Sequence, residues 1–312
     1  MRRRGKGGGL MRWDDFRSSD NVEDRRGEGG GGMGFPGGGA GGLGIGTIVV
    51  LLIIGWVTGI NPAILIGGAE QMTRGGGQSR EERVDPQTQQ RRNQKPTDDS
   101  GRFAAKILGN TEDVWSQILP NQTGKAYTPT TMVLYTGGTR SGCGSAQAAM
   151  GPFYCPLDKK IYLDTTFFRE MATKFGVKGD FAYAYVIAHE VGHHIQDVLG
   201  ILPKVQARQQ QASSKREANA LSVRVELMAD CLAGVWAKNS NDKWNALEPG
   251  DIDEALAAAN AIGDDKLQEA SRGYAVPDSF THGSSEQRKR WFMTGYKSGQ
   301  TRSCDTFRTA NN

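Results

Sequence analysis

Residues 180–199 read DFAYAYVIAHEVGHHIQDVL, and they are the most informative segment of the chain. Ile187, Val191 and Ile195 recur every fourth residue, which predicts a helix that turns one apolar face toward a core. His189 lies away from this apolar stripe. The segment therefore predicts a core-packed helix that presents a histidine on a different face.

This helix contains an H-E-x-x-H motif, and three of the four histidines of the chain lie within it or directly after it. Residues i and i+4 lie one turn apart, about 6 Å between Cβ atoms, so the imidazoles of His189 and His193 can bind one zinc ion. Glu190 would then lie beside the ion, where a carboxylate can act as general base toward metal-activated water. A polar helix face of hydrogen-bonded histidines is the alternative. His194 cannot face the same ion, and we expect it to pack or to support the site.

A catalytic zinc site needs a third protein ligand and leaves one position open. Glu226 and Asp230 form another i, i+4 pair in a predicted helix, which favours Glu226 as the ligand and Asp230 as the group that orients a ligand imidazole. His282 competes for the ligand role, but its Gly/Ser-rich surroundings suit a catalytic donor to the developing oxyanion. An ordinary ion pair on a helix surface is the alternative for Glu226.

Hydrophobic periodicity along the rest of the chain predicts an α+β domain that is mainly helical and has a small sheet. Strands are expected at residues 131–135 and 161–163. Helices are expected at residues 103–119, 165–174, 180–199, 206–238, 251–270 and 284–297. Asp251 is a candidate N-cap for the helix that begins there.

The first hundred residues are expected to lie outside the folded domain. Seventeen of the 43 glycines fall in the first 46 residues, so residues 1–42 are predicted to form a disordered Gly/Arg-rich tail. Residues 43–67 carry no charge and predict one transmembrane helix, with a cleaved signal peptide or a buried core helix as alternatives. Residues 68–100 are typical of a hydrated linker, which leaves residues 101–308 as the folded domain.

The positions of the cysteines indicate the cellular compartment, and the net charge indicates which kinds of partner to expect. All four cysteines follow the hydrophobic segment, in a region that would lie outside the cytoplasm. Their spacing pairs Cys143 with Cys155 and leaves Cys231 with Cys304, although four cysteines allow three connectivities and four free thiols are the alternative. A net charge of +4 with both signs mixed along the chain gives no indication of nucleic-acid binding.

Several segments together resemble the bacterial neutral zinc metallopeptidase family, within the broader gluzincin type. They read GPFYCP at 151–156, KIYLDTTFF at 160–168, HEVGHHIQ at 189–196, ELMADCLAG at 226–234 and HGSSEQR at 282–288. The resemblance extends over about residues 100–308, and a Gly-rich tail followed by one hydrophobic segment also fits it. A longer gap between His193 and Glu226 departs from the best-studied gluzincins.

The resemblance implies a zincin-like domain with one zinc ion, peptide-bond hydrolysis, and the ligand set His189, His193 and Glu226 with Asp230 beside it. We therefore expect a zinc-dependent peptidase that acts on peptides or proteins, and more specifically an endopeptidase. We expect it to cross the bacterial inner membrane once and to hold its catalytic domain outside the cytoplasm. A non-catalytic, membrane-tethered interaction protein and a cell-wall peptide amidase are the alternatives, and the intact Glu190 favours an enzyme over the former.

Substrate binding is also expected to follow the gluzincin pattern, with an extended peptide along a sheet edge at residues 161–164. Arg288 and Trp291 lie one helical turn apart near His282 and can line a side-chain pocket. A core tryptophan with a surface arginine is the alternative for this pair.

Overall fold

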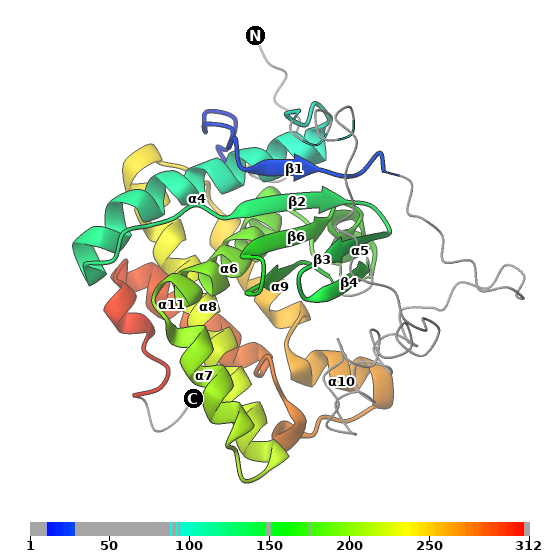
Figure 1. Ribbon diagram of the computed structural model, residues 1–312, viewed down its shortest axis with the longest axis vertical. Coiled ribbons are helices and arrows are strands. Elements are labelled where there is room, and N and C mark those ends of the chain that lie inside the picture. The colour runs from blue at the N-terminus through cyan, green and yellow to red at the C-terminus, as the bar shows by residue number, and fades with distance from the viewer. Residues whose placement is uncertain are drawn as a thin grey trace, which may run out of the picture. The chain divides into compact units, whose positions relative to one another are not determined.

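The computed structural model describes residues 11–28, 88, 92, 94–147, 151–174 and 176–308. The chain forms two compact units, each treated separately below. Unit 1 consists of Met1–Asp20, Thr97–Thr130 and Phe168–Asn312, and unit 2 consists of Asn21–Pro96 and Thr131–Phe167. Figure 1 shows the elements of both units.

Unit 1 is helical, and a long central helix, α8, organises it. Helix α8 packs against α6 and α11, and α6 in turn packs against α4 and α9. The helices of unit 1 are α4 (Asp99–Thr123), α5 (Phe167–Lys174, whose first residue belongs to unit 2), α6 (Asp180–Val198), α7 (Ile201–Gln210), α8 (Lys215–Trp244), α9 (Asp251–Ala261), α10 (Asp264–Arg272) and α11 (Ser285–Ser298), with the 3-10 turns η2 (Pro277–Ser279) and η3 (Thr301–Cys304).

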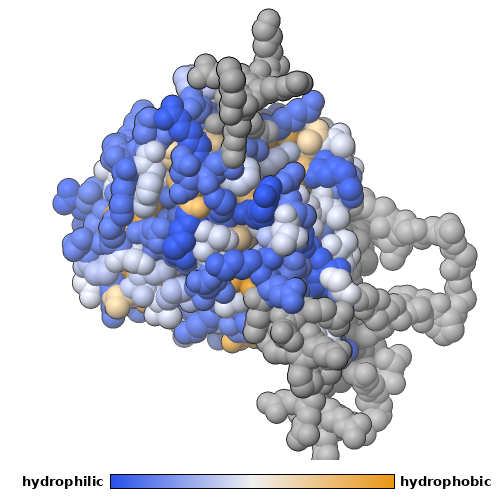
Figure 2. Space-filling view, turned by 90° about the horizontal axis from the view of Figure 1, so that it is seen from above, coloured by the Kyte–Doolittle hydropathy of each residue, from blue (hydrophilic) through white to orange (hydrophobic). Residues whose placement is uncertain are grey.

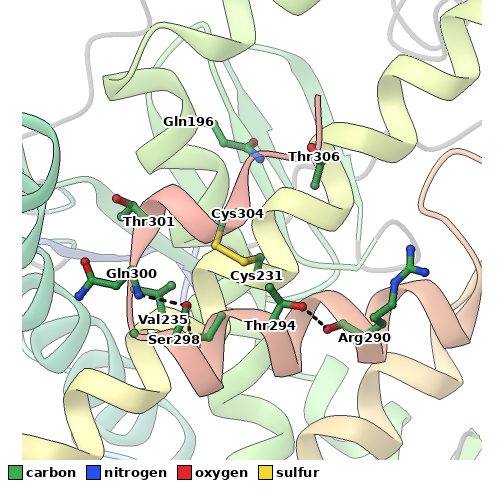
Figure 3. The surroundings of a disulfide bond; sticks show 12 residues. Gln196, Cys231, Val235, Arg290, Thr294, Ser298, Gln300, Thr301, Cys304 and Thr306 are labelled. Carbon is green, nitrogen blue, oxygen red and sulfur yellow. Dashed lines mark hydrogen bonds between the residues drawn. A yellow bond between two sulfur atoms is a disulfide. The ribbon is translucent and has the colours of Figure 1, made fainter. Parts of the chain in front are cut away.

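Helices α8 and α11 approach each other at backbone distance because glycine occupies the contact points. A Cβ atom added to Gly295 would lie 1.8 Å from the carbonyl oxygen of Cys231, and one added to Gly234 would lie 2.1 Å from the carbonyl oxygen of Phe292. A disulfide between Cys231 on α8 and Cys304 on η3 lies in the same region (Figure 3). The position of α8 relative to α11 is therefore tightly constrained.

Unit 2 contains a four-stranded sheet and a hairpin. The sheet has the order β1 (Val22–Asp24), β2 (Thr131–Tyr135), β6 (Lys160–Asp164) and β5 (Phe153–Cys155), and only β5 runs antiparallel to its neighbour. The hairpin pairs β3 (Gly138–Ser141) with β4 (Gly144–Gln147). Buried side chains from the sheet and the hairpin form one core that includes Cys155, and its disulfide partner Cys143 packs against this core.

The structure confirms the α+β class and both predicted strands, and it corrects two helices. The helix expected at 206–238 is interrupted, because Ser214 caps a new helix by accepting a hydrogen bond from the backbone N–H of Glu217. The helix expected at 251–270 is divided into α9 and α10. Asp251 is not its N-cap, since Gly250 holds that position.

The strand expected to bind substrate at a sheet edge is not an edge strand. Residues 160–164 pair with β2 on one side, and residues 160–162 pair with β5 on the other. The edge expectation was therefore wrong for residues 161 and 162, because β5 already uses the backbone groups that a peptide would need there.

Part of the expected disordered tail is folded. Within residues 1–42, residues 11–28 pack into the two units, and Met11, Phe16 and Val22 are all less than one-tenth exposed. These apolar residues stabilise the segment despite the surrounding glycine. The transmembrane helix expected at residues 43–67 lies outside the described residues, and none of the helices that the structure describes is long and apolar enough to cross a membrane.

The surface of the described residues is mainly polar. On the face drawn in Figure 2, hydrophilic side chains dominate and hydrophobic ones occur in small separate spots. Among the described residues, the large apolar side chains that are well exposed are Leu157 and Tyr274.

Candidate metal centre

The facing surfaces of α6 and α8 in unit 1 bring the predicted metal ligands together. His189 and His193 lie one turn apart on α6, with ring centroids separated by 4.8 Å, and Glu226 faces them from α8. Gly192 lies between the two histidines in sequence, and a Cβ atom there would lie 3.0 Å from the carbonyl oxygen of Ala229 on α8. The glycine in the second x position of the motif therefore allows the close approach of the two helices.

Three donor atoms form a compact triangle at this point. The Nε2 atom of His189 lies 3.1 Å from Oε2 of Glu226, and Nε2 of His193 lies 3.5 Å from Oε1 of Glu226. One ligand atom from each of the three residues lies within 4.8 Å of the others. Among the described residues, this is the one group of three or more His, Cys, Asp or Glu side chains with that geometry.

This donor set fits zinc. Two donors that each lie about 2.0–2.1 Å from an ion at the tetrahedral angle are separated by about 3.3–3.4 Å. The two imidazole nitrogens lie 3.1 and 3.5 Å from different oxygens of the Glu226 carboxylate, so the three residues are close enough to converge on one ion. Two imidazole nitrogens and one carboxylate oxygen are also a ligand combination of catalytic zinc sites, where a fourth position stays open.

A buried network fixes the ring of His189. Its Nδ1 atom lies 2.8 Å from Oδ1 of Asp230, which is fully buried, so Nδ1–H donates to the carboxylate and Nε2 faces Glu226. The same carboxylate accepts a hydrogen bond of 2.6 Å from the hydroxyl of Tyr185. Arg288 on α11 donates to it through Nε and Nη2, both at 2.9 Å. Asp230 thus ties α6, α8 and α11 together at the site.

His193 has its own orienting partner. Its Nδ1 atom lies 3.0 Å from Oε1 of Gln196, and Nε2 of Gln196 donates to the carbonyl oxygen of Val225 on α8 at 2.6 Å. This amide orientation lets Gln196 accept from Nδ1–H, which leaves Nε2 of His193 available as a ligand.

The charges of the site couple the titration of its members. Burial alone would lower the pKa of His189, but the charge of Asp230 and the hydrogen bonds to Asp230 and Glu226 raise this pKa to about 10. At His193, burial lowers the pKa and the charge of Glu226 raises it. The net result is a raised pKa. Burial would raise the pKa of Glu226, but the charge of His193 and hydrogen bonds from both histidines hold it well below its usual value.

The structure also places the other predicted residues on α6. Glu190 follows the first ligand directly and is 7% exposed. His194 is buried, its Nε2 atom lies 2.6 Å from the carbonyl oxygen of Thr128, and it does not belong to the donor triangle. His194 therefore packs against Tyr127 and Thr128 outside the donor triangle, which is the packing role among the two expected for it.

His282 is not a member of the donor triangle, but it lies near it. The charge of His282 lowers the pKa of Glu226, and the charge of Glu226 raises the pKa of His282. Its Nδ1 atom lies 3.1 Å from Oδ1 of Asp264, and Oδ2 of Asp264 accepts the backbone N–H of His282 at 2.6 Å. Burial lowers the pKa of His282, whereas Asp264 and Glu226 raise it, and the raised direction prevails. About half of its side chain is exposed, so the imidazole is held in place and accessible.

Several residues of the site were not identified from the sequence. Tyr185 occurs one turn before His189, and Gln196 one turn after His193, so helical spacing alone would have placed them near the ligands. Asp264 lies 18 residues before His282 and gave no local signal. The alternative for Arg288 and Trp291 was a core tryptophan with a surface arginine. Trp291 is buried, as that alternative expected, but Arg288 is also buried and pairs with Asp230.

Comparison with known proteins identifies the family. A family model described as "Putative neutral zinc metallopeptidase" matches residues 11–307. The uncharacterized protein YpfJ of Escherichia coli K12 is 49% identical over 302 residues, which cover 95% of this chain and 99% of that protein. The uncharacterized protein Rv2575 of Mycobacterium tuberculosis H37Rv is 44% identical over 227 residues, which cover 68% of this chain and 74% of that protein. No solved structure matches the chain. The chain belongs to the neutral zinc metallopeptidase family.

Proposed function

We propose that the protein is a zinc-dependent endopeptidase in which His189, His193 and Glu226 bind one zinc ion. The observation that carries this proposal is the donor triangle, in which one atom from each of the three residues lies within 4.8 Å of the others, close enough to converge on one zinc ion. The orientation of both imidazoles by Asp230 and Gln196 supports it, because metal-binding histidines commonly donate their second N–H to such groups.

In this proposal Glu190 moves the proton of the reaction. A zinc ion bound by the triangle would polarise the scissile carbonyl and lower the pKa of a water molecule to about 7. Glu190 accepts a proton as the water oxygen attacks the carbonyl carbon, and it delivers this proton to the amide nitrogen as the C–N bond breaks. The products are one carboxylic acid and one amine.

His282 is proposed to stabilise the negative charge that develops on the carbonyl oxygen. Asp264 holds the imidazole through Nδ1, which directs the Nε2–H away from Asp264 as a donor. A raised pKa keeps this histidine protonated in a larger fraction of molecules at neutral pH, and a cationic donor stabilises an oxyanion better than a neutral one.

We also propose that the protein works outside the cytoplasm. Cys143–Cys155 and Cys231–Cys304 are disulfide-bonded, with the pairing expected from the sequence. Disulfides persist in oxidising compartments and are rare in the cytosol.

Substitution of Glu190 by Gln tests the chemical proposal. We expect the variant to retain one zinc ion per chain and to lose peptide hydrolysis by about 10²–10⁴-fold, measured with a fluorescently labelled unfolded protein and by metal analysis. Glu286→Gln, an exposed residue of α11, is the matched control and should keep full activity. Near-normal activity of Glu190→Gln with zinc bound would exclude Glu190 as the base.

A further inference from the structure

The N-terminal segment, defined here as residues 11–28, is an integral part of both units although residues 29–87 separate it from the rest of the fold in sequence. In unit 1, the backbone N–H of Arg12 donates to the carbonyl oxygen of Ala246 at 2.9 Å. The indole Nε1–H of Trp13 donates to Oδ2 of Asp180, the first residue of α6, at 2.7 Å. The segment is thus attached to the helix that carries the metal ligands.

The contact with α4 is closer still. The backbone N–H of Ser19 donates to the carbonyl oxygen of Ala105 at 2.9 Å. Glu112 of α4, only 4% exposed, accepts hydrogen bonds of 2.7 Å from both Arg17 and Ser19. Gly109 allows this approach, since a Cβ atom there would lie 2.2 Å from the carbonyl oxygen of Arg17. A buried carboxylate with two hydrogen-bond partners, together with backbone contact, makes this an internal interface rather than a loose surface association.

Unit 2 gives the same result independently. Strand β1 pairs in parallel with β2 in register Val22 to Met132. The backbone N–H of Arg25 donates to the carbonyl oxygen of Leu134 at 2.8 Å. Lys160 Nζ lies 3.0 Å from Oε2 of Glu23. Each unit therefore contains chain from before residue 29 and chain from after residue 93.

These contacts are incompatible with a single membrane crossing between the two parts. The hydrocarbon core of a bilayer is about 30 Å thick, and one crossing places the two flanks of the crossing on opposite sides of it. Hydrogen bonds of 2.8–2.9 Å between the flanks cannot form through that layer. The single crossing expected at residues 43–67 and the packing of the N-terminal segment exclude each other.

We infer that the N-terminal segment and the described residues from 94 onward lie on the same side of any membrane that the protein is attached to. Both ends of the chain between them then lie in one compartment. Because both disulfides belong to the later part, the shared compartment is the oxidising one outside the cytoplasm. The inference revises the single-pass topology and does not depend on the catalytic proposal.

Site-directed thiol labelling of the full chain in bacterial spheroplasts tests the inference. Asp15→Cys reports on the N-terminal segment and Lys204→Cys on α7, and both positions are exposed. The native cysteines are disulfide-bonded, so the unsubstituted chain serves as the unlabelled control. We expect a membrane-impermeant maleimide to label both variants before lysis.

Labelling of one variant before lysis and of the other only after lysis would overturn the inference. Labelling of both only after lysis would support the shared side and would overturn the proposed location outside the cytoplasm. The same experiment therefore tests separately whether the two parts share one side of the membrane and whether that side is outside the cytoplasm.

A zero-length cross-link tests the contact itself. A carbodiimide condenses a carboxylate and an amine with loss of water, and Glu23 and Lys160 are close enough to react directly. In membranes that contain the full chain, we expect mass spectrometry to find the Glu23–Lys160 amide in the unsubstituted protein and not in Lys160→Arg. Absence of this cross-link from the unsubstituted protein would contradict the packing of β1 in unit 2.

Discussion

Asp230 accepts hydrogen bonds from Tyr185, His189 and Arg288, and the last of these reaches it with two nitrogen atoms. Three of these hydrogen bonds end on Oδ1 and one, from Nε of Arg288, ends on Oδ2, so both oxygens of the carboxylate are engaged. Burial raises its pKa and the charges of Arg288 and His189 lower it, with the lower direction prevailing. The carboxylate therefore stays ionised and holds His189 with Nε2 toward Glu226.

Tyr185→Phe should weaken zinc binding by about 10-fold or more, because substitution of groups that orient metal ligands commonly costs 10–100-fold in affinity. The substitution leaves the ring in place and removes only the hydroxyl bonded to Asp230. Chelator competition would measure the dissociation constant, with Tyr183→Phe on the same helix as the control. Equal affinities for the two variants would show that the hydroxyl does not support the site.

Zinc binding should release protons. In the metal-free protein the pKa of His189 is raised to about 10 and that of His193 is also raised, so at pH 7 protons occupy positions that the metal needs. Because protons compete with zinc, affinity should fall as pH falls, by about tenfold per pH unit between pH 8 and pH 6 for one displaced proton. Calorimetry in buffers of different ionisation enthalpy measures the number released, and a value of zero would contradict this account.

At the scale of elements, the spacing of residues on helices predicted most of the site. The i, i+4 spacing placed His189 with His193 and Glu226 with Asp230, because one helical turn is a local property that the sequence contains directly. The packing of α11 onto α8 is not local. Glycines at 234 and 295 make it possible, but nothing in the sequence indicated that they face each other.

Gly295→Ala should destabilise the protein by about 3 kcal/mol, because the added methyl group would meet the backbone of α8 and no side-chain rotation can relieve this. Moving α11 away from α8 should also lengthen the contact between Arg288 and Asp230 and lower zinc affinity. Urea denaturation and chelator competition measure the two effects. Gly27→Ala, with no atom within 4 Å of the added Cβ, is the control. A Gly295→Ala variant as stable as this control would contradict the close packing of α8 and α11.

At the scale of the whole molecule, the two disulfides should differ in their contribution to stability. They close loops of 12 and 73 residues, for which chain entropy gives about 3 and about 4.4 kcal/mol of stabilisation. Replacing Cys231 and Cys304 by Ala should therefore lower the free energy of unfolding more than replacing Cys143 and Cys155. Equal losses in denaturant titrations would favour local packing over loop closure as the source of stability.

The sequence predicted the fold class and the closeness of His189, His193 and Glu226, and it was least informative where distant segments meet. Glycine-rich composition suggested disorder throughout residues 1–42, yet Met11, Phe16 and Val22 are buried against segments that follow a long interval of chain. Four apolar residues in 18 do not predict a folded segment, because the surfaces that bury them lie elsewhere in the sequence. The pairing of Asp264 with His282 and the burial of Arg288 went unrecognised for the same reason.

Anomalous X-ray diffraction at the zinc edge, from crystals of the protein loaded with zinc, tests the central claim most directly. We predict one strong peak that lies about 2.0–2.2 Å from Nε2 of His189, Nε2 of His193 and a carboxylate oxygen of Glu226. A peak coordinated by His282 in place of Glu226, or no peak between α6 and α8, would contradict the account.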